Sequence, residues 1–200
     1  MCIGWENNGL YIMRKINGYK TTKELFASGL SKAEIHRQCK EGILVRIKQG
    51  LYRPADMFLQ NQSFIDVAQA MPKGIICMFS ALSFYELTTF IPKQIDVALP
   101  RTTVRSKIIY PPIKRYYIAD AAFDKYVKVI KNGKYSFKIY DIEKTVCDAI
   151  RYRNKVGIDI AKETIKEYIK RKDKNIEKLL AISKLQGTTK LLTEWLTILI

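Results

Sequence analysis

Apolar and polar residues recur with a helical period in two short segments between residues 20 and 42, and a strand pattern follows them up to residue 54. Thr21-Thr22-Lys23-Glu24 fits a capping box, in which a threonine hydroxyl accepts an N–H three residues on and the glutamate reaches back. Gly29 stands where a helix end takes a positive φ, and Ser31 starts a second helix that Gly42 ends. Two helices joined through one glycine are typical of a helix-turn-helix.

The second helix, expected over residues 32–41, carries its long polar side chains at spacings of three and four residues, which place them near one face. A helix in the major groove of DNA reads base edges with such donors. A solvated face on a surface helix is the alternative explanation. The four residues are Lys32, His36, Arg37 and Lys40.

Residues 43–48 alternate in part between apolar and polar side chains, as a half-buried strand does. Gln49-Gly50 is a turn signal, and a returning strand runs until Pro54 stops the pairing. Arg46 and Lys48 fall on one face of the first strand. A basic hairpin directly after a basic helix is typical of the wing of a winged helix-turn-helix, which fixes the register on DNA through phosphate contacts.

The rest of the chain predicts one helix on either side of this motif, over residues 5–16 and 58–71, and then a second half that begins with strands. Asn132-Gly133 is a strong hairpin signal inside that second half. Strands are expected at residues 75–79, 94–99, 113–118, 126–130 and 135–140, and helices at residues 81–87, 141–151, 158–170, 175–186 and 188–199.

The predicted fold class is therefore α+β, with a winged helix-turn-helix followed by a mixed α/β domain that ends in a helical set. We expect the DNA-binding domain over residues 1–56, a linking helix over residues 57–74 and the α/β domain over residues 75–200. No stretch reaches the roughly 18 uninterrupted apolar residues of a membrane helix, so no membrane partner is expected.

The charge balance favours a polyanionic partner. The chain has 35 Lys and Arg against 19 Asp and Glu, a formal net charge of +16, and the excess is spread along the chain rather than collected in a tail. A field of this sign attracts nucleic acid, an acidic protein or an anionic membrane surface. A lysine-rich background composition explains the same excess without a partner.

Cysteine and histidine usage argues against a metal site. The four cysteines, at positions 2, 39, 77 and 147, form no CxxC pair, and the chain has one histidine. Scattered cysteines without a signal peptide indicate free thiols in a reducing cytoplasm. The sequence also contains no phosphate-cradling loop, no dinucleotide fingerprint and no nucleophile elbow. We therefore expect no cofactor, no metal and no catalytic residues.

A metal-dependent nuclease is kept as an alternative. Such enzymes place acidic groups and a lysine on strand-to-helix edges, where Asp96, Asp141, Glu143 and Lys144 are expected. However, no lysine lies two residues beyond the acid at 143, and Asp141 is explained as a helix N-cap. The other alternative is a winged-helix module that binds protein or RNA.

With these motifs placed, the chain resembles the AbiEi family of abortive-infection antitoxins, the transcriptional regulators of type IV toxin–antitoxin systems. One part of the likeness is residues 21–52, which end in the phrase Gly-x-Leu-x-Arg-x-x-x-Gly-x-Tyr from Gly42 to Tyr52. The other part is Phe79-Ser80-Ala81-Leu82-Ser83 with the later Asp141-x-Glu143-Lys144-Thr145-Val146-x-Asp148. The two parts cover most of the chain.

The resemblance implies a cytoplasmic DNA-binding antitoxin of antiviral defence, which represses its own operon at inverted repeats and counters a nucleotidyltransferase-type toxin. By position, the four polar residues of the second helix would read the groove, and Arg46, Lys48 and Arg53 would contact the DNA backbone. Thr21 and Thr22 are counted with this DNA-binding set. The later motif residues either carry function or only hold the fold, and the fold role is favoured. These residues are Ser80, Glu143, Lys144, Thr145 and Asp148.

Overall fold

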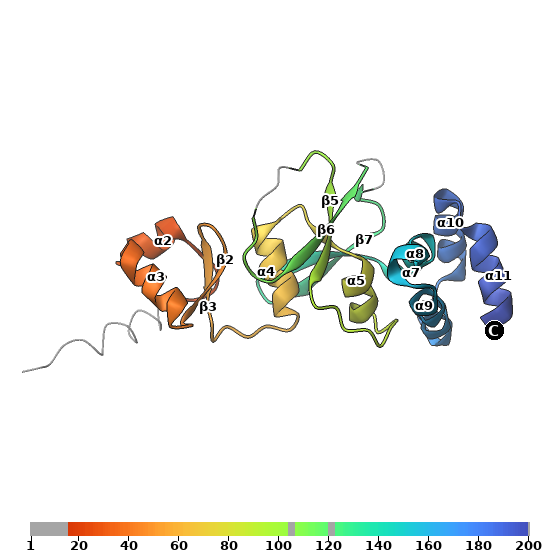
Figure 1. Cartoon of the computed structure of the whole chain (residues 1–200), viewed down its shortest axis with the longest axis horizontal. Coiled ribbons are helices and arrows are strands. Elements are labelled where there is room, and N and C mark those ends of the chain that lie inside the picture. The colour runs from red at the N-terminus through yellow and green to blue at the C-terminus, as the bar shows by residue number, and fades with distance from the viewer. Residues whose placement is uncertain (1–15, 104–106, 120–122, 200) are drawn as a thin grey trace, which may run out of the picture. The chain divides into compact units, whose positions relative to one another are not determined.

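A computed structural model describes residues 16–103, 107–119 and 123–199 of the chain (Figure 1). The helix expected over residues 5–16 lies outside this part except for its last residue. The chain forms two compact units, Met1–Pro72 with Val104–Pro112, and Lys73–Thr103 with Ile113–Ile200. The functional domain boundaries expected from the sequence stay a prediction.

The first unit packs two short helices against a three-stranded antiparallel sheet of order β1-β3-β2. Figure 1 shows α2 and α3 beside the hairpin that β2 and β3 form. Its elements are β1 (Lys20–Thr21), α2 (Thr22–Ala27), α3 (Lys32–Lys40), β2 (Leu44–Lys48), β3 (Leu51–Pro54) and α4 (Gln62–Ala70).

Local signals set the ends of α2 and α3 as the sequence predicts. Thr21 Oγ1 accepts the Glu24 N–H at 3.3 Å, and Glu24 Oε2 accepts the Thr21 N–H at 2.7 Å, which completes the capping box. Ser31 Oγ accepts the Glu34 N–H at 3.1 Å and caps α3. Gly29 and Gly42 follow the two helices with φ of +91° and +72°, values that L side chains rarely adopt.

The core of the first unit lies between these helices and the sheet, and it contains both Leu30 and Ile35, the apolar residues on either side of the α3 cap. The helix expected over residues 58–71 begins only at Gln62, because Asn61 before it takes a left-handed conformation with φ of 56°. Phe58, where that helix was expected to begin, is 87% exposed.

The second unit is built on a five-stranded mixed sheet of order β6-β5-β4-β8-β7, in which β4 and β8, and β5 and β6, are parallel. Helices α7 to α11 gather into one bundle (Figure 1). The elements are β4 (Ile75–Ile76), α5 (Met78–Phe84), β5 (Ile95–Pro100), β6 (Ile113–Ile118), β7 (Val127–Asn132), β8 (Tyr135–Tyr140), α7 (Ile142–Arg151), α8 (Arg153–Val156), α9 (Ile158–Lys170), α10 (Ile176–Gln186) and α11 (Thr189–Leu199).

One core joins the sheet to the helices of the second unit. Ala98 and Tyr140 of the sheet belong to the same buried cluster as Val146 of α7, Ile165 of α9 and Leu192 of α11. Helix α11 therefore docks onto the core through its apolar face. Among the described residues, no helix is long and apolar enough to cross a membrane.

Two predicted elements of this unit are wrong in position. The apolar run at residues 75–79 divides into the two-residue strand β4 and the start of α5, so Ser80 lies inside the helix rather than just before it. Ser80 Oγ accepts the Asp96 N–H at 2.8 Å, which ties α5 to β5. The hairpin loop lies one residue later than expected, because Asn132 still pairs with Tyr135.

Asp96 of β5 is buried, with its side chain accepting the Phe79 N–H at 3.0 Å, and burial raises the pKa of its carboxyl to about 6. The folded state therefore binds this proton more tightly than the unfolded state, so the free energy of unfolding falls as pH rises from about 4 to about 6. At pH 7 most of the carboxylate is charged, and we expect Asp96→Asn to stabilise the unit by roughly 1–3 kcal/mol.

Urea unfolding at pH 5 and pH 7 measures this effect. The gain from Asp96→Asn should be larger at pH 7, whereas Glu194→Gln, at an exposed carboxylate of α11, should change stability little at either pH. A gain that is equal at the two pH values would contradict the assignment of the cost to the buried charge.

Candidate nucleic-acid interface

Helix α3 and the β2–β3 hairpin border one hollow of about 450 Å³. Lys32 and His36 reach it from α3, Arg46 and Gln49 from the hairpin, and Thr22 from the start of α2. The Thr22 N–H donates to the Gly50 carbonyl at 3.1 Å, which fixes the start of α2 against the turn of the hairpin. The order of the elements thus brings the helix and the hairpin that the sequence singled out to one surface.

The basic side chains on α3 differ in how available they are to a ligand. Lys32, His36 and Lys40 are exposed, and no ion pair among the described residues engages them. The guanidinium of Arg37 is exposed too, but its Nη2 donates to Glu34 Oε1 at 2.6 Å and its Nε lies 4.0 Å from Glu41 Oε1. To bind a nucleic acid, Arg37 would have to give up its ion pairs with these two carboxylates.

On the hairpin, Arg46 is exposed and its guanidinium lies 6.0 Å from the centre of the Tyr52 ring, within the range of a cation–π contact. A bulge follows, because Arg46 pairs with Tyr52 while Lys48 already pairs with Leu51, and it interrupts the alternation assumed from the sequence. The ammonium of Lys48 donates to the Ala70 carbonyl at 2.7 Å and is half-buried.

The expected phosphate contact of Arg53 is wrong. Arg53 is 6% exposed, its Nε lies 2.9 Å from Oδ1 of the fully buried Asp66, and its Nη1 donates to the Pro54 carbonyl at 3.0 Å. Tyr19 and Gln62 donate to the same Asp66 oxygen. Arg53 therefore ties β3 to α4 in the interior, where it cannot reach a duplex.

Thr21 is exposed, but its hydroxyl serves the helix cap: it accepts from the Glu24 backbone and donates to Glu24 Oε2 at 2.8 Å. Of the two threonines, Thr22 is the one that borders the hollow.

Sequence reasoning missed a segment that lies beside the hairpin. Ile108 forms an antiparallel bridge with Lys48, and the N–H groups of Ile109 and Tyr110 both donate to the Ile47 carbonyl, at 2.8 and 3.1 Å. The exposed Lys107 next to them lines a second hollow, together with Arg46, Lys48 and Gln49. The only signal in the sequence is the basic character before Pro111-Pro112, and a pairing over sixty residues away leaves no local pattern.

The later motif residues are buried in the second unit, where three of them bond across packed elements or within a helix. Ser80 joins α5 to β5, the Thr145 hydroxyl donates to the Asp141 carbonyl at 2.8 Å, and Glu143 accepts from the Tyr168 hydroxyl at 3.2 Å and lies 3.2 Å from Lys178 Nζ. Lys144 and Asp148 line a cavity instead.

The acidic residues of the nuclease alternative have structural partners. Asp141 caps α7 by accepting the Lys144 N–H at 2.8 Å, and it lies 2.7 Å from Lys178 Nζ, while Asp96 accepts from the backbone of α5. Within the described part of the chain, no group of three or more His, Cys, Asp or Glu residues is placed to hold a metal ion.

Comparison with known proteins identifies the N-terminal segment. Residues 17–55 match the family model described as transcriptional regulator, AbiEi antitoxin. No curated protein matches the chain. The matched residues contain β1, α2, α3 and both strands of the hairpin. The resemblance seen in the sequence is thereby confirmed for this segment, which is similar to the AbiEi antitoxin family of transcriptional regulators.

Proposed function

We propose that this chain is a DNA-binding transcriptional regulator whose residues 20–54 form a winged helix-turn-helix, with α3 as the recognition helix and the β2–β3 hairpin as the wing. The observation that carries the proposal is the hollow that α3 and the hairpin share, bordered by exposed cations from both elements. Groove reading needs donors on the helix, and backbone contacts need cations on the wing.

The structure refines which residues we propose for each task. Lys32, His36 and Lys40 would face base edges, and Arg46 with Lys107 would contact phosphates. Arg37 and Lys48 can join only after leaving the partners described above, and Arg53 is removed from the set. Residues 107–110 are added to the DNA-binding unit because they pair with the edge of β2.

We further propose that the protein is a cytoplasmic autorepressor and antitoxin, which binds inverted repeats at its own operon and counters a nucleotidyltransferase-type toxin. The match of residues 17–55 to antitoxin regulators supports this reading, as does the net charge of +16. An inverted repeat requires two copies of the chain on the DNA.

Fluorescence anisotropy over a series of salt concentrations tests the interface. Each phosphate contact adds about 0.9 to the slope of log K against log salt. We therefore expect Arg46→Gln and Lys107→Gln each to lower that slope by about 0.9, both on the DNA upstream of the gene and on a random duplex of equal length. Lys190→Gln, at an exposed lysine of α11, is the charge-matched control and should leave the slope unchanged.

Lys40→Gln should act differently, because it removes a proposed base contact. We expect it to reduce the preference for the upstream DNA over the random duplex by about tenfold. Equal affinity of the unmodified protein for both duplexes would favour the protein- or RNA-binding module instead. Unchanged slopes in both wing variants would remove the phosphate contacts proposed here.

A further inference from the structure

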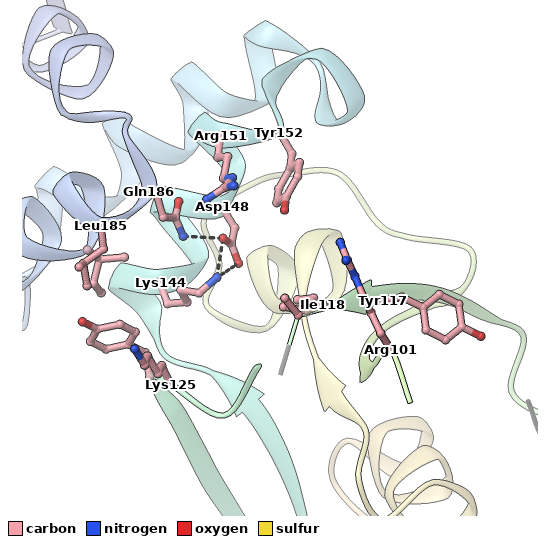
Figure 2. Close-up of a pocket in the computed structure, with 13 residues that line it drawn as sticks. Arg101, Tyr117, Ile118, Lys125, Lys144, Asp148, Arg151, Tyr152, Leu185 and Gln186 are labelled. Carbon is pink, nitrogen blue, oxygen red and sulfur yellow. Dashed lines mark hydrogen bonds and ion pairs between the residues drawn. The ribbon is translucent and has the colours of Figure 1, made fainter. Parts of the chain in front are cut away.

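The second unit contains a cavity of about 440 Å³ that the proposed DNA-binding function does not use. The ends of β5 and β6, the segment before β7, and helices α7 and α10 surround it (Figure 2). Pockets for small ligands have volumes of about 300–1,000 Å³ and combine apolar walls with a few placed polar groups. This cavity has that size, and its polar groups divide into a buried floor and an exposed rim.

The floor is a network of three side chains. Lys144 Nζ lies 2.6 Å from both oxygens of Asp148, and Gln186 Nε2 donates to Asp148 Oδ1 at 2.8 Å (Figure 2). Both members of the ion pair are buried, and the Lys144 ammonium also lies 4.6 Å from the centre of the Tyr140 ring. The carboxylate and the ammonium compensate each other, so the floor itself contributes little net charge.

The amide oxygen of Gln186 has no hydrogen-bond donor within this network. A carboxylate can only accept here, so the amide must turn its nitrogen toward Asp148 and its oxygen away. Gln186 Oε1 is buried, and no hydrogen-bond donor to it is found in the described part of the chain. A buried acceptor without a partner is uncommon in folded proteins, and an N–H group of a bound ligand would satisfy it.

The rim is basic. Arg101, Lys125 and Arg151 line the cavity and are exposed, and no ion pair among the described residues neutralises them. Figure 2 shows the Arg101 side chain extending from the end of β5 toward the Tyr152 hydroxyl, with Arg151 above Asp148. Three uncompensated cations around one opening favour an anionic ligand, and two of them offer the forked donors that suit phosphate.

The walls are apolar: Ile118 of β6 lines the cavity together with Ile182 and Leu185 of α10, and Tyr152 lines it as well. We propose that this cavity binds a nucleotide, with its phosphates on the Arg101, Lys125 and Arg151 rim, its base against the apolar wall, and a base N–H donating to Gln186 Oε1. Lys144 and Asp148 are then positioning residues, because they hold the Gln186 amide with its nitrogen on Asp148 and its oxygen left without a protein partner.

Isothermal titration of the full chain with ATP, CTP, GTP and UTP tests the proposal, with tripolyphosphate and the matching nucleosides as partial probes. We expect at least one nucleotide to bind more tightly than tripolyphosphate and than its own nucleoside. Arg101→Gln and Arg151→Gln should each weaken that binding by about tenfold. Lys190→Gln, which removes a charge elsewhere in the same unit, should bind as the unmodified protein does.

Gln186→Met separates the two parts of the site, since it keeps the side-chain length and removes the acceptor. It should abolish the advantage of the nucleotide over tripolyphosphate while tripolyphosphate binding stays the same. Arg46→Gln should leave nucleotide binding unchanged, because its charge belongs to the other unit. The proposal is overturned if no nucleotide binds, if tripolyphosphate binds as tightly as every nucleotide, if both rim variants bind normally, or if Arg46→Gln abolishes binding. Thermal unfolding checks that each variant is folded.

Discussion

Replacing Asp66 with alanine is expected to destabilise the first unit by about 3–5 kcal/mol, because it leaves a buried guanidinium without its counter-charge. Asp66 is fully buried and Arg53 is 6% exposed, so water cannot take over the role of the carboxylate. Tyr19 and Gln62, which donate to the same oxygen, lose this acceptor as well, although Gln62 Nε2 keeps its hydrogen bond to the Tyr19 hydroxyl. Urea unfolding of the full chain measures the loss, and hydrogen exchange of the α3 amides assigns it to this unit.

Two variants separate burial from ion pairing as the cause. Arg37 and Glu34 lie 2.6 Å apart, closer than Arg53 and Asp66, but their side chains are 57% and 33% exposed. Glu34→Ala should therefore cost less than about 1 kcal/mol. The double variant Arg53→Met with Asp66→Leu removes both charges. It should recover much of the stability that Asp66→Ala loses. Equal losses for Asp66→Ala and Glu34→Ala would show that burial does not set the cost.

The contrast between the exposed Arg37 and the buried Arg53 also explains which parts of the interface could be predicted from the sequence. Ser31 and Gly42 are local signals, so the bounds of α3 and the outward cations on it follow from the sequence alone. The burial of Arg53 depends on Asp66, thirteen residues further on and in another element. A basic residue in a short strand before a proline looks the same in the sequence whether it faces solvent or a buried carboxylate.

Helix bounds in the second unit were predictable for a similar reason. Asn175 caps α10 by accepting the Lys178 N–H, and Gly157 and Gly187 separate the last helices, so α9 to α11 lie within one residue of their expected positions. The start of helix α5 was not predictable, because its buried residues follow one another without a polar face, and such a run does not distinguish a buried helix from a buried strand.

Non-local pairing is the other limit on prediction from the sequence. The β2 edge is covered by Ile108 and Ile109, which follow β5 along the chain and have no sequence feature that relates them to the hairpin. The cavity of the second unit is a further case, since Arg101, Lys125, Asp148 and Gln186 come from four separate stretches of the chain. Of these, only Asp148 belongs to a motif that the sequence analysis singled out.

Asp148→Ala is the second substitution with a large expected effect. It leaves the Lys144 ammonium, 8% exposed, with the face of the Tyr140 ring, and a desolvated cation–π contact contributes only about 2 kcal/mol. Removing one partner of a buried pair commonly costs about 3–5 kcal/mol, and we expect a loss of that size in the free energy of unfolding of the second unit. The matched control is Glu167→Ala, since Glu167 and Lys170 also lie 2.6 Å apart but are 37% and 68% exposed.

The double variant Lys144→Met with Asp148→Leu then distinguishes a stabilising role of the pair from a positioning role. Well-packed apolar residues can replace a buried ion pair without loss, so the double variant should recover much of the stability that Asp148→Ala loses, apart from the cost of the unpaired Gln186 amide. Nucleotide binding should not recover with it, because the double variant lacks the carboxylate that orients Gln186. A double variant that regains both stability and nucleotide binding would show that the pair positions nothing in the cavity.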